Sequence, residues 1–145
     1  MLTPTVGANI RSFGFISSPA NVRWQAHINS SDGNLYFDAG EVCCAGGSSR
    51  AFLNTANNGL WKQYTMQRFN TNKLVRVNGA QQINGIGNAD SYDASNTSFG
   101  IGNSDQSTTG GHIGLIGEAI LLKSVLSQVE LQDIENNQMR SWNAF

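Results

Sequence analysis

The last third of the chain, residues 111–142, constrains the fold more than any other segment. It reads GHIGLIGEAILLKSVLSQVELQDIENNQMRSW. We predict a long buried strand, a tight turn at Lys123-Ser124 and a capped terminal helix. Apolar residues on both faces of the strand indicate a central position in a sheet. Gly114 and Gly117 within it indicate a bulge or the close approach of another backbone.

The terminal helix is expected over residues 127–143. Ser127 followed by Glu130 is a capping box, because the hydroxyl can accept from a free amide while the carboxylate reaches back. One apolar stripe on this helix contains Leu131, Ile134, Trp142 and Phe145, with Gln138 interrupting it. Trp142 is therefore expected to pack the helix on the sheets.

Upstream, short apolar runs with a period of two alternate with turn signals, which predicts strands and hairpins. Asp32-Gly33 between two such runs predicts a hairpin, because glycine adopts a positive φ without steric cost. The expected strands are Ile10–Ile16, Val22–Ile28, Leu35–Ala39, Arg50–Leu53, Trp61–Phe69, Leu74–Val77 and Ser98–Gly102.

The strand at 61–69 carries Gln63, Thr65 and Gln67 on one side, so we expect that face to be wet. Residues 80–97 are expected to be a polar loop with one weak strand at most, and 103–111 a second loop. Many short strands and one terminal helix indicate an all-β sandwich of two antiparallel sheets.

The length of 145 residues indicates a single domain. Charged residues make up 13% and the net charge is −1, so we expect neither a nucleic-acid partner nor an anionic membrane surface. No secretory leader or membrane span is recognisable. Cys43 and Cys44 are adjacent, which strains a mutual disulfide and indicates neither a disulfide scaffold nor a metal site.

Three motifs in order resemble the concanavalin A-like lectin/glucanase superfamily, especially its LamG (laminin-G-like) members. They are the tryptophan-led strand Trp61–Met66, the Asn-Gly hairpin of Leu74–Gly79, and Ile116–Glu118 followed by Leu126–Leu131. The resemblance covers about residues 24–142. It implies a jelly-roll sandwich.

Two positions depart from the family pattern. Gly117 stands where the family usually has an acidic residue, and Arg76 stands where it usually has an aromatic one. The family also opens with a further strand that pairs with the closing one. Either residues 1–16 supply it as a strand or arm, or another chain does, because an unpaired edge accepts a partner strand.

Catalysis is not expected. Glycoside hydrolysis needs two carboxylates about 5–10 Å apart, whereas Glu41 and Glu118 stand alone on their strands. We expect Glu118 to be structural, satisfying backbone amides or pairing with a cation. His27 and His112 fall on different predicted strands without a recognisable nucleophile, so we expect half-exposed strand residues rather than bases.

Calcium is the candidate metal, because it takes oxygen ligands from loops. Asp90 and Asp93 are the proposed ligands, and the pairs Asp32 with Asn34 and Asn103 with Asp105 offer similar atoms. The alternative interpretation is that these residues simply form turns.

A glycan site would combine an aromatic platform with amide and carboxylate side chains on loops. The candidate residues are Asn88, Asp90, Tyr92, Asn103 and Asp105. Trp24 and Trp61 are expected in the core instead.

Three functions are therefore in competition. The first is a non-catalytic surface module of a virus particle, such as a capsid decoration or tail protein, which contacts other subunits and forms a homo-oligomer. The low charge, the Asn-, Ser- and Gly-rich faces, the lack of a leader and the open edge favour it, and it implies a virion or extracellular location. The second is a free-standing carbohydrate-binding lectin. The third is a glycan-cleaving enzyme, which the missing carboxylate pair argues against.

Overall fold

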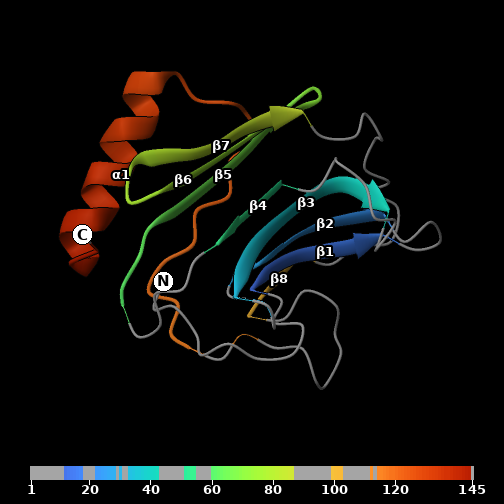
Figure 1. The fold of residues 1–145 in the computed structure, drawn as a ribbon. Coiled ribbons are helices and arrows are strands. Elements are labelled where there is room, and N and C mark those ends of the chain that lie inside the picture. The colour runs from blue at the N-terminus through green and yellow to red at the C-terminus, as the bar shows by residue number, and fades with distance from the viewer. Residues whose placement is uncertain are drawn as a thin grey trace.

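The computed structural model describes residues 12–17, 22–28, 30, 33–42, 51–54, 60–86, 99–102, 112 and 114–144. They form two antiparallel sheets and one C-terminal helix (Figure 1). The predicted class, mostly strands in two antiparallel sheets followed by a helix, is confirmed.

The larger sheet has five strands in the order β4-β3-β2-β1-β8. Their bounds are β1 Phe13–Ser17, β2 Val22–His27, β3 Asn34–Val42, β4 Ala51–Asn54 and β8 Gly100–Ile101. The hairpin predicted at Asp32-Gly33 joins β2 to β3. Gly33 has a φ of +78°, and Ser30 N donates to Asn34 O at 2.8 Å, so the turn uses glycine as expected.

The smaller sheet has the order β5-β6-β7, with bounds of Tyr64–Phe69, Asn72–Val77 and Ala80–Ile86. Asn78 and Gly79 both have positive φ, 48° and 72°, as a tight two-residue hairpin requires. The expectation of a polar loop from residue 80 is wrong at its start. The hairpin returns the chain alongside β6, where backbone pairing and the packing of Ile83 make β7 a full strand.

The hydrophobic core lies where the two sheets meet. Ile28, Leu35 and Phe37 come from the larger sheet and Val75 from the smaller one. Ile28, Leu35 and Val75 are fully buried. Partly buried side chains from both sheets surround this cluster, namely Phe13, Trp24, Tyr64, Met66 and Ile83. Trp24 therefore packs on the core, as predicted.

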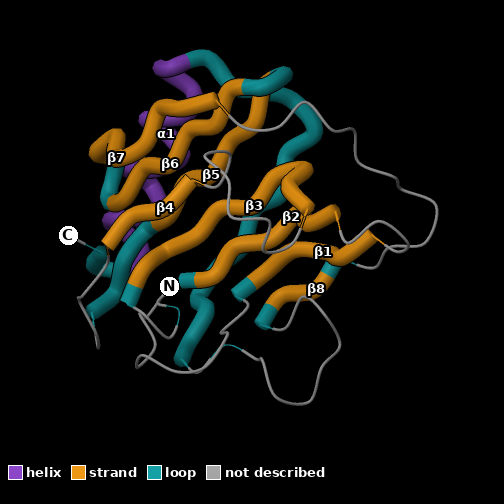
Figure 2. Tube along the Cα trace, turned by 45° about the vertical axis from the view of Figure 1, so that its right-hand side comes forward, coloured by secondary structure: helices purple, strands orange, loops and turns teal. Residues whose placement is uncertain are grey.

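The helix α1 (Gln128–Trp142) covers the face of the smaller sheet that points away from the larger one (Figure 2). Ser127 is its N-cap and forms the predicted capping box with Glu130. Asn143, in the left-handed conformation, ends it. Because α1 covers this side of β5, the expectation of a wet face is wrong: Gln63 is buried and Thr65 donates to Glu135 on the helix.

The closing segment, defined here as residues 114–127, is not the predicted buried strand. It has no strand structure, and the chain bends at Lys123-Ser124 where a turn was predicted. Leu115 and Leu121 are 60% and 71% exposed. An apolar run forms a central strand only when strands flank it on both sides, and here the segment passes along the open side of the sheets instead (Figure 1).

Within the described residues, no helix is both long and apolar enough to cross a bilayer.

Candidate functional site

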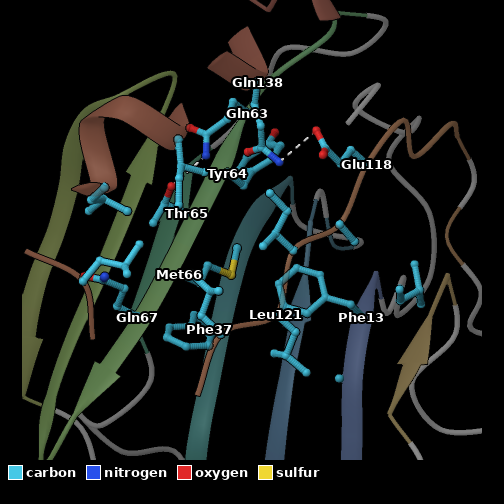
Figure 3. Close-up of a pocket in the computed structure, with 18 of the residues that line it drawn as sticks. Phe13, Phe37, Gln63, Tyr64, Thr65, Met66, Gln67, Glu118, Leu121 and Gln138 are labelled. Carbon is cyan, nitrogen blue, oxygen red and sulfur yellow. Dashed lines mark hydrogen bonds between the residues drawn. The ribbon is translucent and has the colours of Figure 1, made fainter. Parts of the chain in front are cut away.

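A cavity of about 690 Å³ opens between the two sheets, beside β5 and the closing segment. We call it the central cavity. Its apolar wall comes from strands of both sheets, through Phe13, Trp24, Phe37, Tyr64 and Met66 (Figure 3). The closing segment lines its open side from Glu118 to Leu126. Cavities of this size and apolar character are typical of binding sites.

Aromatic packing fixes the walls of the central cavity. The Arg68 guanidinium lies 5.0 Å from the ring centroid of Trp24, a cation–π contact that ties β5 to β2 across the gap. Phe13 and Phe99 are in tilted contact, with ring centroids 6.4 Å apart. The Arg68–Trp24 contact therefore crosses between the two sheets, whereas Phe13 and Phe99 pack together at the edge of the larger sheet.

The helix end of the cavity is polar. Gln63 Nε2 donates to Thr65 Oγ1 at 2.7 Å, and Thr65 Oγ1 donates to Glu135 Oε1 at 2.6 Å. Gln63 Oε1 is buried and has no hydrogen-bond partner among the described residues. Burial also lowers the pKa of the neighbouring Lys62. This end of the cavity therefore has a hydrogen-bond acceptor available.

Glu118 is held by the helix, not by backbone amides or a cation as expected. Its Oε2 accepts from Gln138 Nε2 and Trp142 Nε1, each at 3.3 Å (Figure 3 shows the Gln138 bond). These hydrogen bonds tie the closing segment to α1. Trp142 in turn stacks on Trp61, with ring centroids 5.6 Å apart, so the closing segment, α1 and the start of β5 meet here.

The same junction explains why residue 117 is a glycine. A Cβ at this position would lie 2.7–2.8 Å from atoms of the Trp142 ring. Only glycine permits that approach without displacement. The prediction of a bulge or of a close backbone at Gly117 is wrong, because a side chain, that of Trp142, makes the close approach.

Most of the large side chains of the closing segment face water. Leu115, Ile120, Leu121, Leu122 and Val125 are all exposed, and we call this set the aliphatic patch. Sequence reasoning missed the patch because it placed the same residues inside a sheet. The signal that could have found it is that the sequence leaves the pairing strand open between residues 1–16 and another chain.

The two histidines compare differently with expectation: His112 is half-buried as expected but lies outside any strand, whereas His27 is buried. His27 is 4% exposed and not half-exposed, with Nε2 3.8 Å from Asp38 Oδ2. His112 Nδ1 lies 3.1 Å from Ser12 Oγ, a pair that the sequence did not suggest. Ser12 is fully buried, and its Oγ accepts from Ile28 N at 3.2 Å. Ser12 Oγ therefore joins His112 to the residue that follows β2.

The predicted ligand residues lie outside the described residues. These are Asn88, Asp90, Tyr92, Asp93, Asn103 and Asp105, together with Glu41, whose side chain is not described, and Cys43 and Cys44. In the part of the chain that the structure does describe, no group of three or more His, Cys, Asp or Glu residues could hold a metal ion.

No protein-family model matches the sequence, and neither a curated protein nor a solved structure matches the chain.

Proposed function

We propose that this chain is a non-catalytic module of a larger protein assembly, such as the surface of a virus particle, and that it works by contact with other subunits. The aliphatic patch is the observation that carries this proposal. Leu121 is 71% exposed, and four further large aliphatic side chains are exposed within ten residues of it. Large aliphatic side chains exposed together in one segment favour a role in protein–protein contact.

Energetics favour a partner that covers the patch. Burying one leucine or isoleucine side chain completely contributes about 1.5–3 kcal/mol. Leu121 and Leu122 are both exposed, so covering both contributes several kcal/mol before the entropic cost of association. The low net charge of −1 adds little repulsion between identical subunits.

The fold that this function rests on is a jelly-roll sandwich of the concanavalin A-like type, again as a proposal. Two antiparallel sheets that share one core and the ordered hairpins at Gly33 and Gly79 support it. The two positions at which this chain departs from the family pattern have local explanations. Arg76 pairs with Glu135, and Gly117 leaves room for the Trp142 ring.

Oligomeric state tests the assembly function. Light scattering coupled to size exclusion, over a hundredfold range of concentration, should show a dimer or larger species that dissociates on dilution. Leu121→Ser combined with Leu122→Ser should move the midpoint of dissociation at least tenfold upward. Leu60→Ser is the matched control, because Leu60 is 54% exposed but lies outside the patch. A wild-type chain that stays monomeric throughout would contradict the proposal.

Glycan binding is the second candidate, at the loops that flank β8. Gly102 N donates to Ser12 O at 2.7 Å, and His112 N donates to Gly102 O. The segment with Asn103 and Asp105 therefore begins and ends at one point beside β8. The segment with Asn88, Asp90 and Tyr92 leads into the other end of β8, which is only two residues long. The described residues next to these two segments, Phe99 and Gly102, therefore flank the same short strand.

Calcium-dependent retention on immobilised glycans tests this second candidate. Asp90→Asn with Asp93→Asn should abolish the calcium dependence, and Tyr92→Ala should weaken glycan retention with or without calcium. If the purified chain still binds glycans in the presence of EDTA, the calcium part of this proposal is wrong. Absence of any glycan signal would leave the assembly function as the whole role.

A further inference from the structure

Leu121 stands at the mouth of the central cavity. Its side chain helps line the cavity between Met66, Phe37 and Phe13, yet 71% of its surface is exposed (Figure 3). Moving such a side chain from water into an apolar cavity is favourable. An occupant for the cavity is therefore present in the same chain, attached beside its entrance.

The segment that carries Leu121 is held at both ends and not between them. At one end Gly117 packs on Trp142, and Glu118 accepts hydrogen bonds from the helix. At the other end Ser127 caps α1. In residues 119–126 only Leu126 is partly buried; the rest are exposed. These two attachments are natural hinge points for the stretch between them.

The same stretch is the right length to lie along β5. Eight extended residues reach about 26 Å, and the six residues of β5 span about 20 Å. Glu118 is tied through Trp142 to Trp61, just before β5 begins. Val125 shares a small hollow with Phe69, where β5 ends. β5 is also an edge strand of its sheet, so its outer backbone groups face this segment's side.

Alternation along an extended chain assigns each side chain a direction. Glu118 points to the helix, so Ile120 and Leu122 share that side and would approach Ile134 of α1. Leu121 points the opposite way, into the gap between the sheets. Aliphatic side chains of this stretch can therefore reach both surfaces that border the cavity entrance, the helix α1 on one side and the gap between the sheets on the other.

We propose that residues 119–126 form a hinged strap with two positions. In the closed position Leu121 enters the central cavity of its own chain, and Ile120 and Leu122 pack on α1. In the open position the same side chains contact a neighbouring subunit. The inference rests on the proposed function and adds its regulation: a free subunit hides its assembly surface until a neighbour displaces the strap.

Cysteine cross-linking tests the closed position directly. The variant carries Met66→Cys and Leu121→Cys, with Cys43 and Cys44 replaced by serine. A disulfide forms only when the two Cα atoms come within about 7 Å. Oxidation of dilute monomer should give an intrachain bond, seen as a monomer of faster mobility on a non-reducing gel. A matched control pairs Leu121→Cys with Gln82→Cys on the exposed part of β7 and should give no intrachain bond.

A bond only between chains, or no bond at all, would overturn the closed strap. The cross-linked chain also tests the competition: it should remain monomeric at concentrations where its reduced form assembles. A locked chain that assembles as readily as the reduced one would overturn the competition. If the wild-type chain never assembles, the proposed function and the competition fail, whereas the intrachain bond still decides whether the strap closes.

Discussion

Arg76 and Glu135 form a buried ion pair that fastens α1 to β6. Arg76 Nε lies 2.8 Å from Glu135 Oε1 and 3.1 Å from Oε2, and the side chains are 7% and 1% exposed. Arg76 also donates to Gly79 O in the hairpin, and Thr65 donates to the same carboxylate. Two strands, one turn and the helix therefore share a single charged centre.

Breaking this pair should destabilise the chain strongly. Arg76→Leu leaves Glu135 as a buried charge without its partner, which costs about 3–5 kcal/mol. The double variant Arg76→Leu with Glu135→Leu should recover much of that loss, because neither charge then remains buried alone. Urea unfolding of the two single variants and the double variant measures this coupling. A double variant that loses as much stability as the two single variants added together would show that the two charges are not coupled.

Gly117→Ala should lower stability by about 1–3 kcal/mol, because the added methyl group meets the Trp142 ring and the packing must shift. Gly85→Ala is the control, since the nearest atom to a Cβ there is 4.0 Å away. Tryptophan fluorescence should change for Gly117→Ala alone, because the Trp61–Trp142 stack moves. An unchanged spectrum with unchanged stability would contradict the contact.

Hairpins and caps were predictable from the sequence because their causes are local. Gly33, Asn78 and Gly79 need only their own backbone conformations, and the capping box at Ser127 needs only a residue three positions on. Such signals survive any tertiary arrangement. The helix bounds and the two-sheet class followed from them.

The closing segment was not predictable, because its neighbours are far away in sequence. Apolar residues such as Leu115 and Leu121 predict burial whatever their local pattern is. They are exposed because no strand flanks them in the described part of the structure. The burial of Glu135 on the helix was unpredictable for the same reason, because its partner is far away in sequence. It occupies the buried face four residues after Leu131, where a charge is unexpected, and it fits there because Arg76 lies opposite. The central cavity was likewise unpredictable from the sequence, because it depends on how far apart the two sheets lie.

Lys73 should make stability rise at alkaline pH. It is buried in β6, its Nζ lies 3.4 Å from Phe37 O, and burial lowers its pKa to about 8 although Asp38 opposes the shift. The unfolded chain, with an ordinary pKa near 10.5, holds more protons than the folded chain between about pH 8 and 10.5. Stability therefore increases with pH across that window.

The Lys73→Met variant isolates this effect. It should be more stable than wild type at pH 7, because no charge is then buried, and the advantage should shrink between pH 8 and 10.5. Taking the difference between the two proteins cancels titrations that both share. A difference in unfolding free energy that does not vary with pH would exclude a displaced Lys73 pKa.

The capping box should make the stability of the chain depend on pH in the acid range. Ser127 Oγ and N both donate to Glu130 Oε2, at 2.7 and 2.9 Å, and these bonds lower the pKa of Glu130 below its ordinary value of 4.5. Because the folded pKa is the lower one, the stabilisation is present above about pH 4.5 and is lost as the pH falls through the folded value. Ser127→Ala should destabilise by about 1 kcal/mol at pH 7, and its deficit should narrow below pH 4. Ser127→Thr, which keeps the hydroxyl, should retain both the stability and the acid dependence, and a threonine variant as weak as alanine would show that the hydroxyl is not the cap.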